Sequence, residues 1–540
     1  MSETVDSVVI GGGHNGLVAA NQLADAGWDV VVLEAAAEPG GAVRDAEVTA
    51  PGYHSDLFSA FFPMAAASPV IAGLGLEDHG LVWTHAPRVL AHLRPSQPAV
   101  LLHREVEATA SGLEGDAKGD GEAWRDLHSM WERMGPDMMA ALLGPMPPLR
   151  ATARLALKAR MELIELARLA ILPVRRLAAE RFTGEGPALL LAGNALHADV
   201  TPDAAPSALL GWMLVGLAQT VGFPVPVGGS GRITDALTAR LLRAGGEVRC
   251  ATRVERVDVV DGRATGVVVG GQQITARRAV IAACDAQLLY DRLVGVDKLP
   301  AAYAAGLRRF QRASSTVKVN WAVDGLVPWR DPSVAGAGTV HLADSLDELT
   351  MTSAQLSIGQ VPADPFLLIG QMTTTDSVRS PAGTESLWAY THVPQDVRGD
   401  AGGELRGTGV LRGDDLRRFV DRIEARVEAH APGFASMVVG RQVQGPDDLE
   451  AENPSLIGGD LSGGTAQLHQ QLIFRPVPGF ARPETPIAGL FLGSASAHPG
   501  GSVHGACGAN AARAAILHDR LARGRQAARR LTARAGGVRH

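Results

Sequence analysis

The amino-acid sequence predicts an α/β fold whose first domain contains a parallel β-sheet. Near the start of the chain, a β-branched run at residues 8–10 leads into a glycine-rich turn and a helical segment, and another strand follows at residues 30–33. Near the other end, residues 490–492 precede a second glycine-rich turn and a helix of small residues. Strand–turn–helix units of this kind build Rossmann-like sheets, so we expect both chain ends to contribute to one Rossmann-like domain.

The first glycine-rich turn has the spacing of a dinucleotide-binding motif. Gly11, Gly13 and Gly16 follow the strand directly, in a G-x-G-x-x-G pattern. The first permits a tight turn, the second lets the backbone approach a pyrophosphate, and the third lets the helix pack on the strand. The next strand ends at Glu34, where a carboxylate can accept a hydrogen bond from a ribose hydroxyl. This context favours a dinucleotide site over a plain glycine turn, but the motif alone leaves FAD and NAD as alternatives.

The residues after Glu34 favour FAD. Gly40 and Gly41 allow the chain to pass close to a cofactor, and the guanidinium of Arg44 can meet a phosphate charge. This arrangement resembles the extended fingerprint of FAD-binding oxidoreductases of the glutathione-reductase type. The alternative is a surface Pro-Gly-Gly turn.

The C-terminal turn predicts the second half of the same site. Gly493 follows the strand, residues 499–503 form a proline- and glycine-rich loop, and a helix of small residues begins near Gly505. A helix N-terminus aimed at a flavin stabilises negative charge on the reduced ring. The alternative is a glycine-rich turn before an unrelated helix.

Five motifs together carry a resemblance to a family: GGGHNG, EPGGAVR, PVGGSGRITDAL, DGRATGV and SAHPGGSVHGACGANAA. The set resembles the carotenoid (phytoene) desaturase-like FAD-dependent oxidoreductases, in the branch of pyridine nucleotide-disulfide oxidoreductase domain-containing protein 2. The resemblance covers nearly the full length, is specific at both ends, and is loose at residues 91–225. The branch name suggests a redox disulfide, yet the three cysteines are far apart and form no C-x-x-C, which argues against dithiol chemistry.

The resemblance implies a non-covalently bound FAD that is held by residues from both chain ends. The implied cofactor contacts are Gly11, Gly13, His14, Asn15, Gly16, Glu34, Gly40, Gly41, Arg44, Val254 through its backbone, Gly493, Gly501, Ser502 and Val503. We expect His14 to support the glycine loop rather than to attach the flavin covalently. The resemblance also implies hydride transfer from a substrate C–H bond to flavin N5.

Catalytic candidates are few, because hydride transfer depends on proximity and a dry cavity more than on an acid–base pair. His504 follows the flavin loop and is expected to face the ring or the substrate, and Arg475 is a candidate to hold a carboxylate or an oxyanion. His498, just before the flavin loop, is a further candidate, and His197 and Asp199 are candidates for the pocket wall. For each of them a hydrogen-bonded structural role is the alternative. The sequence predicts no metal site.

These features predict an FAD-dependent oxidoreductase of the dehydrogenase, desaturase or isomerase type, with an apolar, isoprenoid or lipid-like substrate. A flavin amine oxidase is one alternative, disfavoured because the chain has four tyrosines and the C-terminal flavin loop carries no aromatic residue. A non-enzymatic prenyl- or lipid-binding relative is another, disfavoured because the glycine fingerprint is intact. The electron acceptor and the oligomeric state stay open.

The motifs divide the chain into interleaved domains. We assign residues 1–90, 226–309 and 487–520 to the FAD-binding domain, residues 91–225 and 310–486 to an α+β substrate domain, and residues 521–540 to a flexible basic tail. The net charge of −7 and the 4% aromatic content argue against a nucleic-acid partner.

The expected location is cytoplasmic, with contact to a membrane surface. The N-terminus leaves no room for a signal peptide, and no apolar stretch reaches the length of a membrane span. Residues 149–181 predict a helix, interrupted at Pro173, that carries Arg150, Arg154 and Lys158 on one face. Such a basic face can lie on an anionic membrane, although glutamates dilute it and an ordinary covering helix is the alternative.

Overall fold

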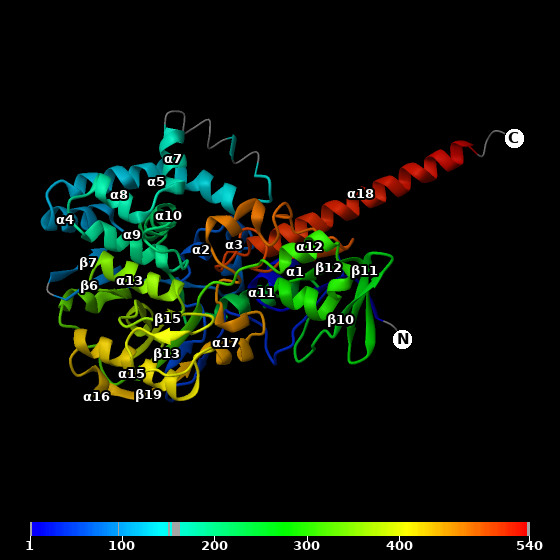
Figure 1. Ribbon diagram of the computed structural model, residues 1–540. Coiled ribbons are helices and arrows are strands. Elements are labelled where there is room, and N and C mark those ends of the chain that lie inside the picture. Colours follow the sequence, from blue (N-terminus) through cyan, green and yellow to red (C-terminus); the bar gives the residue numbers. More distant parts are fainter. Residues whose placement is uncertain (1–2, 96, 149–151, 154–161, 537–540) are drawn as a thin grey trace.

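The computed structural model describes residues 3–95, 97–148, 152–153 and 162–536. Two seven-stranded sheets form the centres of two lobes that lie side by side (Figure 1). One lobe contains both ends of the described chain, and the other carries a layer of helices on the side of its sheet where α5 and α10 lie. This arrangement confirms the predicted α/β class.

The first sheet contains the two predicted Rossmann-like units. Its order is β10 (Arg256–Val260), β11 (Arg263–Val269), β12 (Gln272–Ala282), β1 (Glu3–Ile10), β2 (Val30–Leu33) and β9 (Glu247–Arg249), with β20 (Leu490–Leu492) paired to β12. Strands β20, β12, β1, β2 and β9 run parallel, while the β10–β11 hairpin is antiparallel. Strands β1, β2 and β20 are almost wholly buried, as expected for β-branched and leucine-rich strands in a covered parallel sheet.

Helices pack on this sheet through very close backbone contacts. Helix α1 (His14–Asp25) packs against α18 (Ala506–Gly536) and α11 (Gly231–Arg243). A Cβ atom on Gly16 would lie 2.0 Å from the carbonyl oxygen of Gly11, and one on Gly508 would lie 1.9 Å from that of Asn15. Glycine is therefore required at both positions for the two helices to start where they do.

The second sheet has an apolar core on one face and the cavity described below on the other. Its order is β19 (Val438–Gln444), β13 (Ser315–Val323), β17 (Glu385–Val393), β16 (Leu367–Gln371), β14 (Ala337–Leu342), β6 (Arg88–Arg94) and β7 (Gln97–Leu102). All neighbours are antiparallel except β6 and β14. Alternate side chains such as Val319, Trp321 and Ile369 pack with α15 (Gly413–His430) into one apolar cluster. Because side chains alternate between faces, the residues between them point to the other face.

The remaining elements connect and cover these sheets. The other α-helices are α2 (Pro63–Ala66), α3 (Pro69–Ala72), α4 (Val106–Asp116), α5 (Asp120–Leu143), α7 (Glu162–Ile171), α8 (Val174–Arg181), α9 (Gly186–Leu196), α10 (Ser207–Thr220), α12 (Ala301–Leu307), α13 (Leu346–Ser357), α14 (Met372–Thr375), α16 (Phe434–Met437) and α17 (Pro446–Glu452). The short strands are β3 (Asp45–Glu47), β4 (His54–Asp56), β5 (Trp83–Thr84), β8 (Val225–Pro226), β15 (Gln360–Val361) and β18 (Gly399–Asp400). Short helical turns are η1 (Leu76–His79), η2 (Leu288–Val294), η3 (Val296–Lys298), η4 (Pro332–Gly336), η5 (Ile457–Gly459), η6 (Leu468–Gln470) and η7 (Leu472–Phe474).

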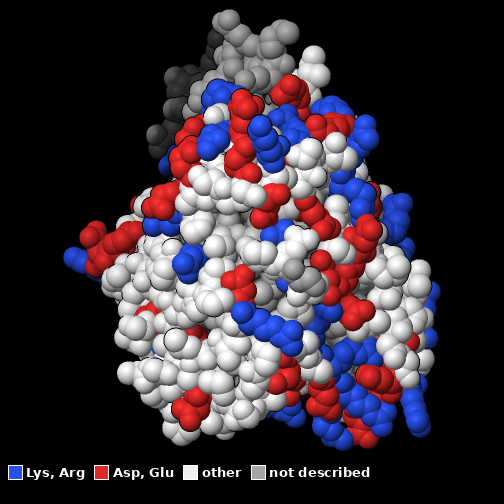
Figure 2. Space-filling model, turned by 90° about the vertical axis from the view of Figure 1, so that its left-hand side faces the viewer, with Lys and Arg blue, Asp and Glu red and all other residues white. Residues whose placement is uncertain are grey.

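The helix predicted at residues 149–181 is described in its second half. Helices α7 and α8 are separated at Pro173, where the sequence predicts an interruption. Arg150, Arg154 and Lys158 lie outside the described residues. In α7 and α8, Arg168 and Arg176 both pair with Glu180. Acidic and basic side chains are interspersed over the face shown in Figure 2.

The C-terminal segment differs from the predicted flexible tail. Residues 521–536 continue α18, whose last turns project away from the lobe (Figure 1). The segment is rich in alanine and arginine, which favour helix, and it contains no proline. None of the helices in the described part of the chain is both long and apolar enough to cross a membrane. The predicted domain boundary at residue 90 falls inside β6.

Candidate functional site

A cavity of about 710 Å³ joins residues from both chain ends with residues of the second sheet and of α5 and α10. Its wall has two parts. The first, which we call the glycine wall, is formed by the loops after β1, β2 and β20. The second, which we call the sheet wall, is formed by β14 and β17, and apolar helix side chains lie beside it.

The N-terminus of α1 opens the glycine wall. Gly13 caps this helix without a side-chain hydrogen bond, and the first turn contains no acidic residue. The free N–H groups and the positive end of the helix dipole are therefore available to an anion. His14 Nε2 and Asn15 Oδ1 are buried, line the cavity and have no hydrogen-bond partner. This wall fits a dinucleotide, because it offers unpaired polar atoms and backbone that can be approached closely.

Glu34 fixes the shape of the glycine loop. Its carboxylate accepts hydrogen bonds from the backbone N–H groups of Gly12, at 2.7 Å, and Ala36, at 2.8 Å. It lines the cavity at the end of β2, the position from which an acid reaches a ribose hydroxyl. The same carboxylate can therefore shape the loop and receive the nucleotide.

Arg44 is held in place by hydrogen bonds to backbone carbonyls of the protein itself. Its Nε donates to the carbonyl of Gly41 at 3.0 Å, and a terminal nitrogen donates to the carbonyl of Glu452 at 3.1 Å. The guanidinium carbon lies 5.4 Å from the centre of the Phe58 ring. With φ of +57°, Gly41 takes the left-handed conformation that lets the chain turn toward the loop at Gly13.

The C-terminal loop completes the glycine wall. Gly501, Ser502 and Val503 line the cavity, and α18 begins just after them. Because α18 packs tightly on the start of α1 at Gly508, the N-termini of the two helices reach the same cavity. A flavin in this cavity would meet two positive helix ends.

Most predicted cofactor residues lie in the cavity wall. Those that line it are Gly11, Gly13, His14, Asn15, Glu34, Gly41, Arg44, Val254, Gly501, Ser502 and Val503. Gly16, Gly40 and Gly493 do not line it, and each acts through packing. Gly493, for example, lies between β12 and α18, where a Cβ atom would be 3.1 Å from Ala511.

His504 lines the cavity but is tied to the start of α18. Its Nδ1 accepts a hydrogen bond from the N–H of Ala506 at 3.0 Å, and the side chain is buried. Burial, with a smaller effect of nearby His14, lowers the pKa of His504 to about 3. The imidazole is therefore neutral at pH 7, and its visible role is to organise the helix start.

The structure gives Arg475 a different role from the predicted one. Its guanidinium donates to the carbonyls of Ala495, Thr465 and Gly463, at 3.0, 3.0 and 2.6 Å respectively, with further contacts to Ser462 and Gly464. It is fully buried, and burial lowers its pKa to about 10. Because backbone carbonyls occupy its donors, Arg475 holds two loops together rather than presenting a charge to a substrate carboxylate.

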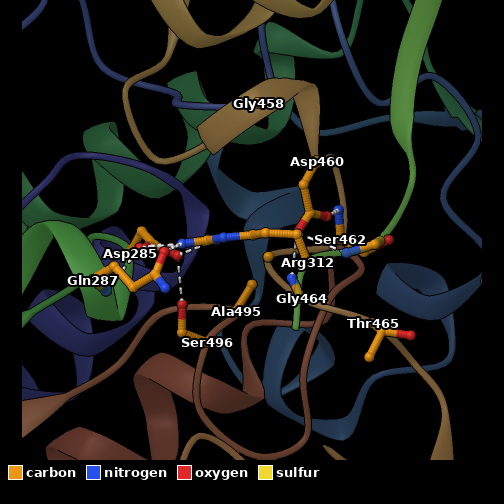
Figure 3. Close-up of polar contacts among 12 residues, drawn as sticks. Asp285, Gln287, Arg312, Gly458, Asp460, Ser462, Gly464, Thr465, Ala495 and Ser496 are labelled. Atoms are coloured by element: carbon orange, nitrogen blue, oxygen red, sulfur yellow. Dashed lines mark hydrogen bonds and ion pairs between the residues drawn. The ribbon is translucent and has the colours of Figure 1, made fainter. Parts of the chain in front are cut away.

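A second arginine joins the same loops (Figure 3). Arg312 lies between Asp285, with which it forms two hydrogen bonds of 2.7 and 2.8 Å, and Asp460, which is 3.9 Å away. Ser496 donates to Asp285 at 2.9 Å, and Asp460 accepts from the N–H of Gly464 at 2.7 Å. Neither Arg312 nor Asp460 is among the residues predicted from the sequence, since no local motif marks an ion pair across such separations.

The sheet wall carries aromatic and polar side chains. Trp388 and Tyr390, two residues apart on β17, point to the same face, and their rings stack with centres 5.9 Å apart at 17°. The register places Lys318 opposite Tyr390, on the neighbouring strand. Its Nζ donates to the carbonyl of Asp56, and burial lowers the pKa of Lys318 to about 7. Sequence reasoning missed these residues. The alternating pattern of the segment WAYTH and the single lysine in a β-branched strand were the signals that could have marked them.

The part of the cavity beside the sheet wall is apolar. Its lining consists of apolar side chains from α5, from α10 and from the loop after α10: Met138, Leu142, Leu143, Leu209, Leu210, Met213, Leu214 and Phe223. The two predicted wall residues His197 and Asp199 behave differently. His197 lines the cavity, whereas the carboxylate of Asp199 is turned to Ser314, accepting from its N–H at 2.7 Å.

Comparison with known proteins identifies the family. Residues 16–359, more than half of the chain, match the family described as flavin containing amine oxidoreductase. The chain belongs to this family. It is therefore a flavin-containing oxidoreductase, and the family implies FAD as the flavin.

Individual relatives confirm the resemblance drawn from the motifs. The chain is 27% identical to mouse pyridine nucleotide-disulfide oxidoreductase domain-containing protein 2, over 94% of this chain and 92% of the relative. It is 25% identical to one of the subunits of limonene dehydrogenase from Castellaniella defragrans, over 94% of both chains. A phytoene desaturase (lycopene-forming) of Pseudescherichia vulneris is 25% identical over 56% of this chain and 58% of its own length.

A solved structure is similar across the whole fold. Wild-type putrescine oxidase bound to putrescine superposes with a TM-score of 0.59, covering 97% of this chain and 100% of that one, at 17% identity. At this identity the likeness concerns the fold alone.

Proposed function

We propose that this protein is an FAD-dependent dehydrogenase, desaturase or isomerase that binds FAD non-covalently and acts on an apolar, isoprenoid or lipid-like substrate. The observation that carries the proposal is the continuity of one cavity from the glycine wall to an apolar chamber lined by Met138, Leu209, Met213 and their neighbours. An apolar lining favours a ligand that gains from leaving water.

The names of two relatives point to the same substrate class. Limonene and phytoene, which appear in those names, are isoprenoids. The relative that carries the first name matches almost the full length of this chain. This supports an isoprenoid or similarly apolar substrate here.

The chain's own residues bind and position the reactants. When bound, FAD supplies the capacity to accept a hydride. The N-termini of α1 and α18 favour negative charge at the glycine wall, and Glu34 and Arg44 offer the carboxylate and the guanidinium that a dinucleotide needs. The apolar side chains exclude water from the chamber and hold a C–H-bearing substrate close.

The flavin amine oxidase remains the second candidate, because Trp388 and Tyr390 place two stacked aromatic rings in the cavity wall. Aromatic faces attract ammonium groups. This observation weakens the argument from the small number of tyrosines, since the two rings come from β17 rather than from the C-terminal loop.

Anaerobic titration of the purified flavoprotein separates these functions. Phytoene, limonene, fatty acyl compounds, putrescine and NAD(P)H are each added, and loss of the visible flavin absorption is followed. We expect bleaching by an isoprenoid or acyl compound and none by putrescine. Bleaching by amines alone would establish the second candidate, and bleaching by NAD(P)H alone would show a nicotinamide site.

We also propose that the protein is cytoplasmic and touches a membrane surface beside the cavity. Leu472 lines the cavity and is 43% exposed, and the next residues, Ile473 and Phe474, are 54% and 40% exposed. Three consecutive exposed apolar side chains at a cavity wall are suited to contact with lipid. An apolar substrate could then enter the cavity without crossing water.

A further inference from the structure

The sheet wall contains a hydroxyl that has no partner. Thr339 on β14 is 1% exposed and lines the cavity, and its Oγ1 makes no hydrogen bond. The register pairs Thr339 with Gly370 and Gly370 with Trp388 across three neighbouring strands. The side chains of these positions therefore share the cavity face of the sheet.

Gly370 leaves room for an aromatic ring beside this hydroxyl. A Cβ atom on Gly370 would lie 2.3 Å from the indole of Trp388, so the indole lies across the glycine toward β14. The indole N–H is occupied, since it donates to the sulfur of Met372 at 3.0 Å. Trp388 thus presents an apolar face to the cavity and leaves Thr339 unsatisfied.

A pair of histidines extends the polar strip. His341, two residues after Thr339 on the same face, lies 2.9 Å from His197 between their Nε2 atoms, and His197 lines the cavity. One ring must donate to the other, so the pair is held in complementary tautomers. The ring of His341 packs on Gly193, where a Cβ atom would lie 2.3 Å from Nδ1, and behind it His92 bonds to the carbonyl of Ala343.

The groups of this strip are uncharged at neutral pH. Burial lowers the pKa of His197 to about 3, and it lowers the pKa of His341 well below its ordinary value. Burial, with a smaller effect of Asp199, raises the pKa of Tyr390 well above its ordinary value.

Two charged residues beside the strip, Asp199 and Lys318, are bonded to other groups. The carboxylate of Asp199 accepts from the N–H and the hydroxyl of Ser314, and His392 lies 3.7 Å from it. Lys318 donates to backbone carbonyls near Asp56. Among the residues that the structure describes, no group of three or more histidine, cysteine or acidic side chains is arranged to hold a metal ion.

We propose that Thr339, Tyr390 and His197 form a subsite for one neutral oxygen-bearing group, a hydroxyl or a carbonyl, on an otherwise apolar substrate. This deepens the proposed function and rests on it. The hydroxyls of Thr339 and Tyr390 can each donate or accept, so either an alcohol or a carbonyl oxygen can be satisfied. A pure hydrocarbon leaves the Thr339 hydroxyl unpaired. An ammonium or carboxylate group would meet no free counter-charge, because Asp199 and Lys318 are bonded to other groups.

The test measures binding of four ligands that share one chain length: octane, 1-octanol, octylamine and octanoate. The FAD-loaded protein is titrated with each, and the change in the visible flavin spectrum reports binding. One hydrogen bond in a dry site corresponds to a preference of about three- to tenfold for 1-octanol over octane. We expect the amine and the carboxylate, both charged at neutral pH, to bind no more tightly than octane.

A pair of threonine variants supplies the control. Thr339→Val keeps the shape of the side chain but removes its hydroxyl. It should weaken the binding of 1-octanol by about three- to tenfold and leave the affinity for octane unchanged. Thr391→Val is the matched control, because Thr391 is also 1% exposed with an unpartnered hydroxyl but points to the opposite face of the sheet. It should leave all four affinities as in the wild type. Tyr390→Phe is a second variant that should weaken 1-octanol selectively if Thr339→Val folds poorly.

Three results would overturn the subsite. They are equal affinity for octane and 1-octanol in the wild type, tighter binding of octylamine than of 1-octanol, or equal effects of the two threonine variants. All three measurements use protein that has FAD bound. A protein that fails to take up FAD would instead contradict the proposed function.

Discussion

The glycine wall and the sheet wall bound one cavity, but they are built on different principles. The glycine wall is mostly backbone: helix N-termini, glycines and N–H groups ordered by Glu34. The sheet wall is made of side chains such as Trp388, Tyr390 and Thr339, which strand pairing brings together. A backbone wall suits a constant cofactor, and a side-chain wall suits a substrate that varies among relatives.

Two arginines join the loops next to the glycine wall. Arg475 holds the segments around residues 462–465 and 494–496 against each other through its hydrogen bonds to Thr465 and Ala495. Arg312 joins the same region through Asp285 and Asp460 (Figure 3). Arg475 lines the cavity and has its donors occupied by backbone carbonyls, whereas Arg312 lies behind the wall and pairs with Asp285. The comparison therefore predicts that changes in the glycine wall remove the cofactor, whereas changes in the sheet wall alter which substrate binds.

The largest effect is expected for Gly508→Val. Its side chain would press against the carbonyl of Asn15 and force α18 away from α1. We expect loss of detectable FAD and a fall of about 3 kcal/mol or more in the free energy of unfolding. Bound flavin after gel filtration and urea unfolding measure the two quantities. Gly524→Ala on the same helix, where a Cβ atom meets nothing, is the control and should retain the wild-type flavin content.

A smaller effect is expected for Arg475→Met. The variant leaves the carbonyls of Gly463, Thr465 and Ala495 without their donor, which costs about 2 kcal/mol and corresponds to about thirtyfold weaker FAD binding. Fluorescence titration of the apoprotein with FAD measures it. If FAD affinity is unchanged while turnover falls, Arg475 contacts the reacting groups and the loop-holding role is wrong.

His92, which lies behind the sheet wall on β6, predicts an acid-dependent loss of stability. Burial lowers the pKa of His92 from an ordinary value of 6.5 to about 4, so between these values the unfolded chain binds a proton that the folded chain excludes. The stability contribution is complete above about pH 6.5 and is lost as the pH falls toward 4, by about 3 kcal/mol for one such group.

Urea unfolding at about pH 7.5 and about pH 4.5 tests this loss in the wild type and in His92→Gln, which cannot titrate but can still donate to Ala343. We expect the variant to lose about 2–3 kcal/mol less than the wild type between the two pH values. An identical loss in both proteins would show that His92 titrates normally in the folded state.

The smallest effect is expected at the surface. Ile473→Ser removes one exposed apolar side chain beside the cavity and should weaken binding to lipid vesicles by about 1 kcal/mol, or about fivefold. Co-sedimentation with phosphatidylcholine vesicles measures it. Leu326→Ser, at a position 61% exposed on a different loop, is the control and should bind like the wild type. Equal binding by all three proteins would refute the membrane contact.

The sequence predicted the glycine wall better than the sheet wall for a physical reason. Gly11 lies within one strand–helix–strand unit, and Glu34 and Arg44 follow it closely along the chain, so their spacing in sequence determines their positions in space. Thr339, Gly370 and Trp388 are brought together by strand register, which no local spacing specifies. Even in the glycine wall, sequence spacing did not distinguish glycines that line the cavity from those that only pack, such as Gly493.

The central claim is that both chain ends build one non-covalent FAD site. The most direct measurement is the visible absorption spectrum of the purified protein, followed by denaturation and separation of the released flavin from the chain. We predict a yellow protein that releases one FAD per chain on denaturation. A colourless protein that takes up no added FAD would contradict the account, as would flavin that stays on the denatured chain.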